Sequence, residues 1–96
     1  MKNDLIVLPM SLLDIIMDMS VGEAKTVAYL LKHYHNGSVF HLTREIRLLI
    51  AKETKLKERS IYNIIPLLEE RQIIVRVNMG RLHKLNPKYS DNGILQ

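Results

Sequence analysis

Residues 50–77, IAKETKLKERSIYNIIPLLEERQIIVRV, have the pattern of two helices joined by a tight turn and followed by a strand. Thr43 is a candidate N-cap for the first helix, which we expect to run to about Thr54. Residues 55–57 would form the turn, with Leu56 between the two helices. Apolar residues at helical spacing form the expected core face of each helix. These residues are Ile46, Leu49 and Ile50, then Ile61, Ile65 and Leu68.

A β-hairpin is predicted directly after the second helix. One strand should span 73–78 and its partner 82–85, with Met79-Gly80-Arg81 at the tip. Gln72 lies where a helix-ending glycine is common, and Pro66 should kink or shorten the second helix. The order helix, turn, helix and basic hairpin is typical of the winged helix-turn-helix. The expected fold class is therefore mainly α with a small β-hairpin wing (α+β).

The residues before Thr43 are expected to support this unit. Ser20 and Glu23 form an S-x-x-E capping box that opens a helix to about Tyr34. A short strand is predicted over 39–42. The short helix over 12–18 is apolar nearly all round, so either the core of this domain or a second copy must cover it. The buried face of the 21–34 helix should comprise Val21, Ala24, Val27, Ala28 and Leu31.

Three segments follow from these patterns. Residues 1–19 would be an N-terminal arm and short apolar helix with a possible dimer contact. Residues 20–89 would be the winged helix-turn-helix domain, and 90–96 a flexible tail. The apolar stretch from 5 to 17 contains Pro9 and Asp14 and is too short for a membrane span, so no membrane partner is expected.

Composition limits the chemistry. The absence of cysteine from the 96 residues excludes disulfides and thiolate metal sites and fits a reducing cytoplasm. The four histidines lack metal-binding spacing, so neither a metal nor a cofactor is expected. No glycine-rich phosphate loop or nucleophile motif is present, and Glu69 and Glu70 diverge on a helix as ordinary surface residues. An enzyme is therefore not predicted.

Charge is unevenly distributed. Residues 1–31 hold two Lys/Arg against four Asp/Glu, a net −2, whereas residues 32–96 hold twelve against six, a net +6. This asymmetry indicates a polyanion as the partner of the C-terminal two-thirds.

The second helix carries groups suited to reading DNA. Arg59 suits guanine and Asn63 suits adenine, and their i, i+4 spacing places them on one face. Glu58 would repel phosphate, so we expect it to accept from a cytosine amino group or to orient Arg59. Further candidates for base or backbone contacts are Thr43, Arg44, Arg47, Lys55, Lys57, Ser60, Tyr62, Arg81 and Lys84.

Three segments also carry a family resemblance: LLDIIMDMSVGEAKTVAYLLKH at 12–33, the stretch at 50–77, and LNPKY at 85–89. Through them, the chain from Pro9 to Tyr89 resembles the winged-helix replication initiators of small plasmids of Firmicutes, the replication protein L family. Lys55 and Lys57 stand where that family has a turn glycine and a Ser/Thr cap.

The resemblance implies origin binding on double-stranded DNA during plasmid or phage replication, with host replication proteins as further partners. It places the recognition segment at 57–63 and the wing tip at 79–81. A transcription or copy-number regulator would use the same surface. A third alternative is a protein-interaction module that uses the apolar segment 5–19 and Leu67. A homodimer is expected.

Overall fold

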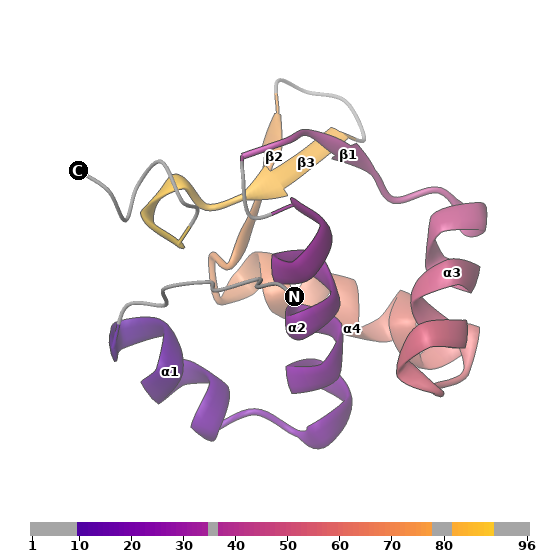
Figure 1. The fold of residues 1–96 in the computed structure, drawn as a ribbon, viewed down its shortest axis with the longest axis horizontal. Helices are drawn as coiled ribbons and strands as arrows, with labels where there is room; N and C mark the ends of the chain where they lie inside the picture. Colours follow the sequence, from indigo (N-terminus) through magenta and orange to yellow (C-terminus); the bar gives the residue numbers. More distant parts are fainter. Residues whose placement is uncertain (1–9, 35–36, 78–81, 90–96) are drawn as a thin grey trace, which may run out of the picture.

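The computed structural model describes residues 10–34, 37–77 and 82–89 (Figure 1). Within these ranges the fold is mainly helical with a small antiparallel sheet of three strands. The elements are α1 (Met10–Met17), α2 (Val21–Tyr34), β1 (Phe40–His41), α3 (Arg44–Thr54), α4 (Glu58–Glu70), β2 (Ile74–Val77), β3 (Leu82–Leu85) and the 3-10 turn η1 (Pro87–Tyr89). The apolar arm before Met10, the hairpin tip with Arg81, and the tail at 90–96 lie outside the described residues.

The sheet has the order β1-β3-β2. β3 pairs antiparallel with β2, from Val77 opposite Leu82 to Ile74 opposite Leu85, and with β1 through Phe40 opposite His83. The two strands predicted after the second helix are therefore confirmed in order and pairing. The strand predicted over 39–42 is shorter, and it joins the hairpin as an edge.

The helices enclose an aliphatic core. α2, α3 and α4 contact one another, and the sheet lies at one end of this group, with α1 and α3 on opposite sides of α2 (Figure 1). The fully buried side chains include Leu12, Val27, Leu30, Ile50, Ile61, Leu68, Ile73, Ile74 and Leu85. No helix within the described ranges is long and apolar enough to cross a membrane.

The predicted N-terminal caps of α2 and α3 are confirmed. The Ser20 amide donates to Glu23 Oε1 (3.2 Å), and the Glu23 amide donates to Ser20 Oγ (3.2 Å), which is the reciprocal pattern of a capping box. The Ile46 amide donates to Thr43 Oγ1 (3.3 Å) at the start of α3. Local sequence thus determines where two of the helices begin.

The predicted buried face of α2 is wrong in part. Val21 and Ala28 are exposed, whereas Thr26 is fully buried and donates its hydroxyl hydrogen to the Gly22 carbonyl (2.9 Å). Glu23 is buried as well, and its Oε2 lies 3.4 Å from Nε of Arg71, at the end of α4. The apolar pattern did not reveal that these two polar residues lie on the buried side of α2.

Exposed apolar residues also differ from the prediction. Leu49 on α3 is exposed, and the small residue Ala51 takes a core position instead. α1 is not buried on all sides: it begins at Met10, before the predicted Leu12, and although Leu12 is in the core, Met17 is 81% exposed. On α4, Ile64 rather than Ile65 lies fully in the buried stripe.

Two left-handed residues end the two central helices. Lys55 has φ 63° after α3, and Gln72 has φ 61° after α4. Both stand where glycine is the usual residue, as the sequence predicted for Gln72. Leu56 follows Lys55, donates its amide to the Ala51 carbonyl (3.0 Å) and packs against the core, which confirms its expected place between α3 and α4.

Pro66 does not end α4, which continues to Glu70, so the predicted shortening is wrong. Pro66 lies on the exposed side of the helix. The Tyr62 carbonyl that would have accepted from an amide at position 66 is therefore on the side that water can reach.

Candidate nucleic-acid interface

One side of α4 is turned to solvent. Ile61 and Leu68 hold the opposite side in the core, which leaves Arg59 and Asn63 exposed one turn apart. Tyr62, next to Asn63, is 60% exposed. Neither Arg59 nor Asn63 makes a side-chain hydrogen bond or ion pair with the described part of the chain. The predicted base-reading residues therefore share one open surface.

The N-terminus of α4 adjoins this surface. Its N-cap is Lys57, in extended conformation (φ −81°, ψ 150°), and among the described residues no side chain caps the first-turn amides. Lys55 and Lys57 are exposed in the turn, while Ser60 is half-buried. Free first-turn amides beside two ammonium groups form an electropositive helix end.

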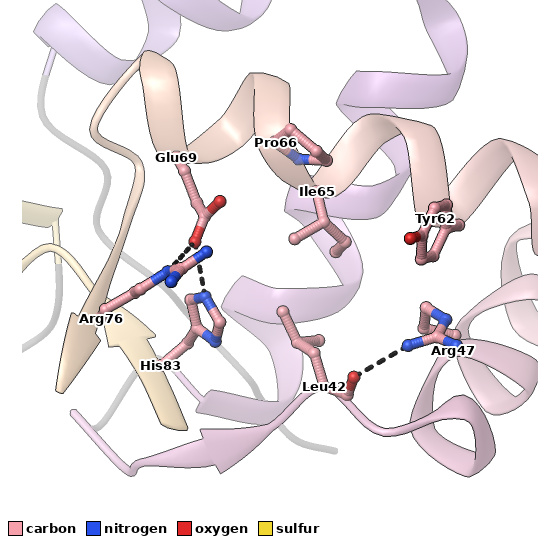
Figure 2. Close-up of a pocket in the computed structure, with 8 residues that line it drawn as sticks. All are labelled: Leu42, Arg47, Tyr62, Ile65, Pro66, Glu69, Arg76 and His83. Atoms are coloured by element: carbon pink, nitrogen blue, oxygen red, sulfur yellow. Dashed lines mark hydrogen bonds and ion pairs between the residues drawn. The ribbon is translucent and has the colours of Figure 1, made fainter. Parts of the chain in front are cut away.

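Arg47 has partners within the chain that the sequence did not predict. Its Nε donates to Glu58 Oε2 (2.9 Å) and its Nη1 to the Leu42 carbonyl (3.0 Å). Its guanidinium carbon lies 5.2 Å from the centre of the Tyr62 ring, and only 19% of its side chain is exposed (Figure 2). Glu58 accordingly pairs with Arg47, and not with Arg59, which was one of the two expectations for it.

The remaining candidates are more scattered. Arg44 is exposed on the first turn of α3, and Thr43 uses its hydroxyl oxygen to cap that helix. Lys84 is not brought together with the α4 residues. It stands opposite Val75, so strand alternation places it on the sheet face away from the one that Arg76 and His83 present to α4.

A groove of about 490 Å³ runs beside this surface (Figure 2). Arg47 and Tyr62 form one end, and a cluster of Glu69, Arg76 and His83 forms the other. In this Glu69 cluster, one carboxylate oxygen accepts from the ring Nε2–H of His83 (2.7 Å) and from Nε of Arg76 (2.9 Å). Leu42, Ile65 and Pro66 line the groove between its ends.

The electrostatics of the Glu69 cluster favour the carboxylate. Burial raises the pKa of Glu69, but the hydrogen bonds and charges of Arg76 and His83 outweigh it, so the pKa lies below the ordinary value. The same hydrogen bond and charge raise the pKa of Arg76. Glu69 is thus a structural anion that joins α4 to both strands of the hairpin.

Sequence reasoning missed the Glu69 cluster and treated Glu69 as ordinary surface. Strand alternation could have shown that Arg76 and His83 lie across from each other, on the face that carries buried Ile74 and Leu85. The partner on α4 depends on how the hairpin packs, which no local pattern reveals. The groove pairs a histidine with a carboxylate, but the described residues that line it include no serine, threonine or cysteine nucleophile.

Within residues 10–34, 37–77 and 82–89, no group of three or more His, Asp or Glu side chains could hold a metal ion. Comparison with protein-family models, curated proteins and solved structures finds no match for this chain.

Proposed function

We propose that this chain binds double-stranded DNA sequence-specifically, with the α3–α4 pair and the β2–β3 hairpin acting as a winged helix-turn-helix. The observation that carries the proposal is the open side of α4. Arg59 and Asn63 lie there without side-chain partners among the described residues, directly after a lysine-rich turn between two packed helices. Polar groups with forked donors and acceptors on one exposed helix face suit the edges of base pairs.

In this proposal, α4 lies in the major groove. Arg59 donates to N7 and O6 of a guanine, and Asn63 pairs with N7 and the amino group of an adenine. The two residues are one helical turn apart, about 5.4 Å, while base pairs are stacked about 3.4 Å apart. The two contacted bases are therefore one or two steps apart.

Backbone contacts come from cations without acidic partners. Arg44, Lys55 and Lys57 make no ion pair within the described part of the chain, in contrast to Arg47 and Arg76. The uncapped amides of α4 add a site for one phosphate, because a helix N-terminus favours anions. These contacts set affinity and orientation, and the α4 side chains set sequence preference.

The biological setting proposed first is replication initiation at a plasmid or phage origin, on the strength of the family resemblance. A transcription or copy-number regulator would need the same surface. Homodimerisation is proposed through α1, where Met17 is exposed on a short apolar helix. The competing function is a protein-contact module built on such apolar residues, including the exposed Leu67.

The test is selection of bound sequences from a random duplex pool at near-physiological salt, followed by sequencing. The expected result is one enriched motif that Arg59→Ala and Asn63→Ala each relax at a different base position. The matched control is Lys25→Ala, which removes an exposed cation from α2 and should leave the motif unchanged. Affinity should fall steeply with salt as counterions are released.

Two outcomes contradict the proposal. Retention without an enriched motif would exclude sequence-specific binding. No retention of duplex would exclude DNA binding and favour the protein-contact module, whose apolar association should be nearly insensitive to salt.

A further inference from the structure

Arg47 differs from its neighbour Arg44 on α3. Arg44 is exposed and unpaired within the described residues, whereas Arg47 is mostly buried and bound at two nitrogen atoms. One of these nitrogens is held by the Leu42 carbonyl just before α3, and the other by Glu58 on α4. Two fixed hydrogen bonds leave this guanidinium little freedom to reach toward a phosphate.

Glu58 and Tyr62 lie one turn apart on α4, and Arg47 meets both of them. Its charge is compensated by the carboxylate at 2.9 Å, while its carbon atom Cζ lies 5.2 Å from the ring centre of Tyr62. A guanidinium at this distance is attracted by the ring face. One side of the Tyr62 ring is thereby supported, and the rest remains open, since the residue is 60% exposed.

We infer that Arg47 is a positioning residue that holds Tyr62 ready for a DNA contact, and that it does not itself contact a phosphate. This inference rests on the proposed DNA binding by α4. Tyr62 lies beside Asn63, and its hydroxyl can donate to a phosphate oxygen without carrying a charge. Because Arg47 fixes the ring before DNA arrives, less side-chain entropy is lost on binding.

The pairing has a second effect on the same surface. An uncompensated Glu58 in the first turn of α4 would repel a phosphate at that helix end. Arg47 compensates the Glu58 charge with its Nε 2.9 Å from the carboxylate, so the carboxylate does not weaken the attraction of Lys55 and Lys57 for phosphate. Arg47 therefore favours binding through two neighbours and no direct contact.

The test uses the full chain and a labelled duplex that carries the selected motif. The key variant is Arg47→Gln combined with Glu58→Gln, which removes the pair without changing net charge. Tyr62→Phe and Tyr62→Ala test the hydroxyl and the ring, and Arg44→Gln serves as the matched control on the same helix. Thermal melts verify that each variant is folded.

The double variant should weaken binding by between about two- and tenfold, the range of one hydrogen bond. Tyr62→Phe should weaken affinity by a similar factor. Adding Tyr62→Ala to the double variant should weaken affinity by less than about a further twofold, because Arg47 and Tyr62 act as one unit. The slope of log affinity against log salt should stay at the wild-type value in the double variant. It should fall by about one for Arg44→Gln, as for a lost phosphate contact.

Two results together would show that Arg47 contacts phosphate and would overturn the inference. The salt slope would fall by about one in the double variant, and the double variant would still weaken affinity in a protein that already carries Tyr62→Ala. A wild type that binds no duplex removes the DNA proposal and the inference together. One measurement needs no DNA: NMR of the free wild type should show Arg47 side-chain protons shifted by the Tyr62 ring. If these Arg47 proton shifts are the same in Tyr62→Ala, Arg47 does not pack on the Tyr62 ring and the inference fails.

Discussion

Replacing Glu69 by alanine should destabilise the packing of the hairpin on α4 more than replacing an exposed carboxylate of the same helix would. The substitution removes two contacts to one oxygen, and these contribute differently to the free energy of unfolding. The His83 side chain is only 7% exposed and lies 2.7 Å from that oxygen. The Arg76 side chain is 64% exposed and lies 2.9 Å away. Burial therefore decides which contact dominates.

A hydrogen bond to a charged group contributes roughly 1.5–3 kcal/mol when one partner is shielded from water. The exposed Arg76 contact is screened by solvent and adds little. For a chain of this length, 1 kcal/mol corresponds to a shift in Tm of about 4–8 °C. Glu69→Ala should therefore lower the free energy of unfolding by about 2 kcal/mol and the Tm by roughly 8–16 °C.

The assay is urea unfolding followed by circular dichroism, with thermal melts in parallel, on the wild type, Glu69→Ala and Arg76→Ala. Glu70→Ala is the matched control, because Glu70 is the exposed neighbour on the same helix. Arg76→Ala should produce less than half of the Glu69→Ala shift, and Glu70→Ala almost none. Equal shifts for Glu69→Ala and Arg76→Ala would refute the reasoning that the buried His83 contact carries the energy.

Four further outcomes are expected. Because the folded-state pKa of Glu69 lies below its ordinary 4.5, the stability it adds is present above that pH and is lost as pH falls through the lowered pKa. The free energy of unfolding, measured by urea titration at a series of acidic pH values, should therefore change less with pH in Glu69→Gln than in the wild type. Gln72→Gly should raise the unfolding free energy by roughly 0.5–1 kcal/mol, since φ 61° costs less for glycine, whereas Gln72→Ala should not. Gly22→Ala should raise Tm by a few degrees: its Cβ would lie 3.4 Å from Ile64 Cδ1, an ordinary contact, and a fall in Tm would contradict this. If α1 forms the proposed dimer, Met17→Glu should sediment as a monomer where the wild type is a dimer, and a wild-type monomer at every soluble concentration would exclude that dimer.

Features fixed by neighbouring residues were predictable from the sequence. The capping box at Ser20, the Thr43 cap and the α3–α4 turn depend on contacts within a few positions, and the paired strands β2 and β3 are adjacent elements in the sequence. The left-handed conformation of Gln72 fits the prediction that it lies where a helix-ending glycine is common.

Features that depend on packing between distant segments were not predictable. On α2, the buried Glu23 meets Arg71, which lies 48 positions away in the chain. The engagement of Arg47 depends on the angle at which α3 crosses α4. Within the candidate interface, the sequence could place Arg59 and Asn63 on one face, but it could not separate the free Arg44 from the internally bound Arg47.

The place of β3 in the sheet has a consequence for how the domain comes apart. β3 is the middle strand, although it is the last of the three in sequence. β1 and β2 have no ladder with each other in the described structure, so detaching β3 removes both ladders in one event. No two-stranded remnant can persist. Loss of β3 therefore dissolves the whole sheet and uncovers the core around Phe40, whereas loss of either edge strand leaves the other ladder in place.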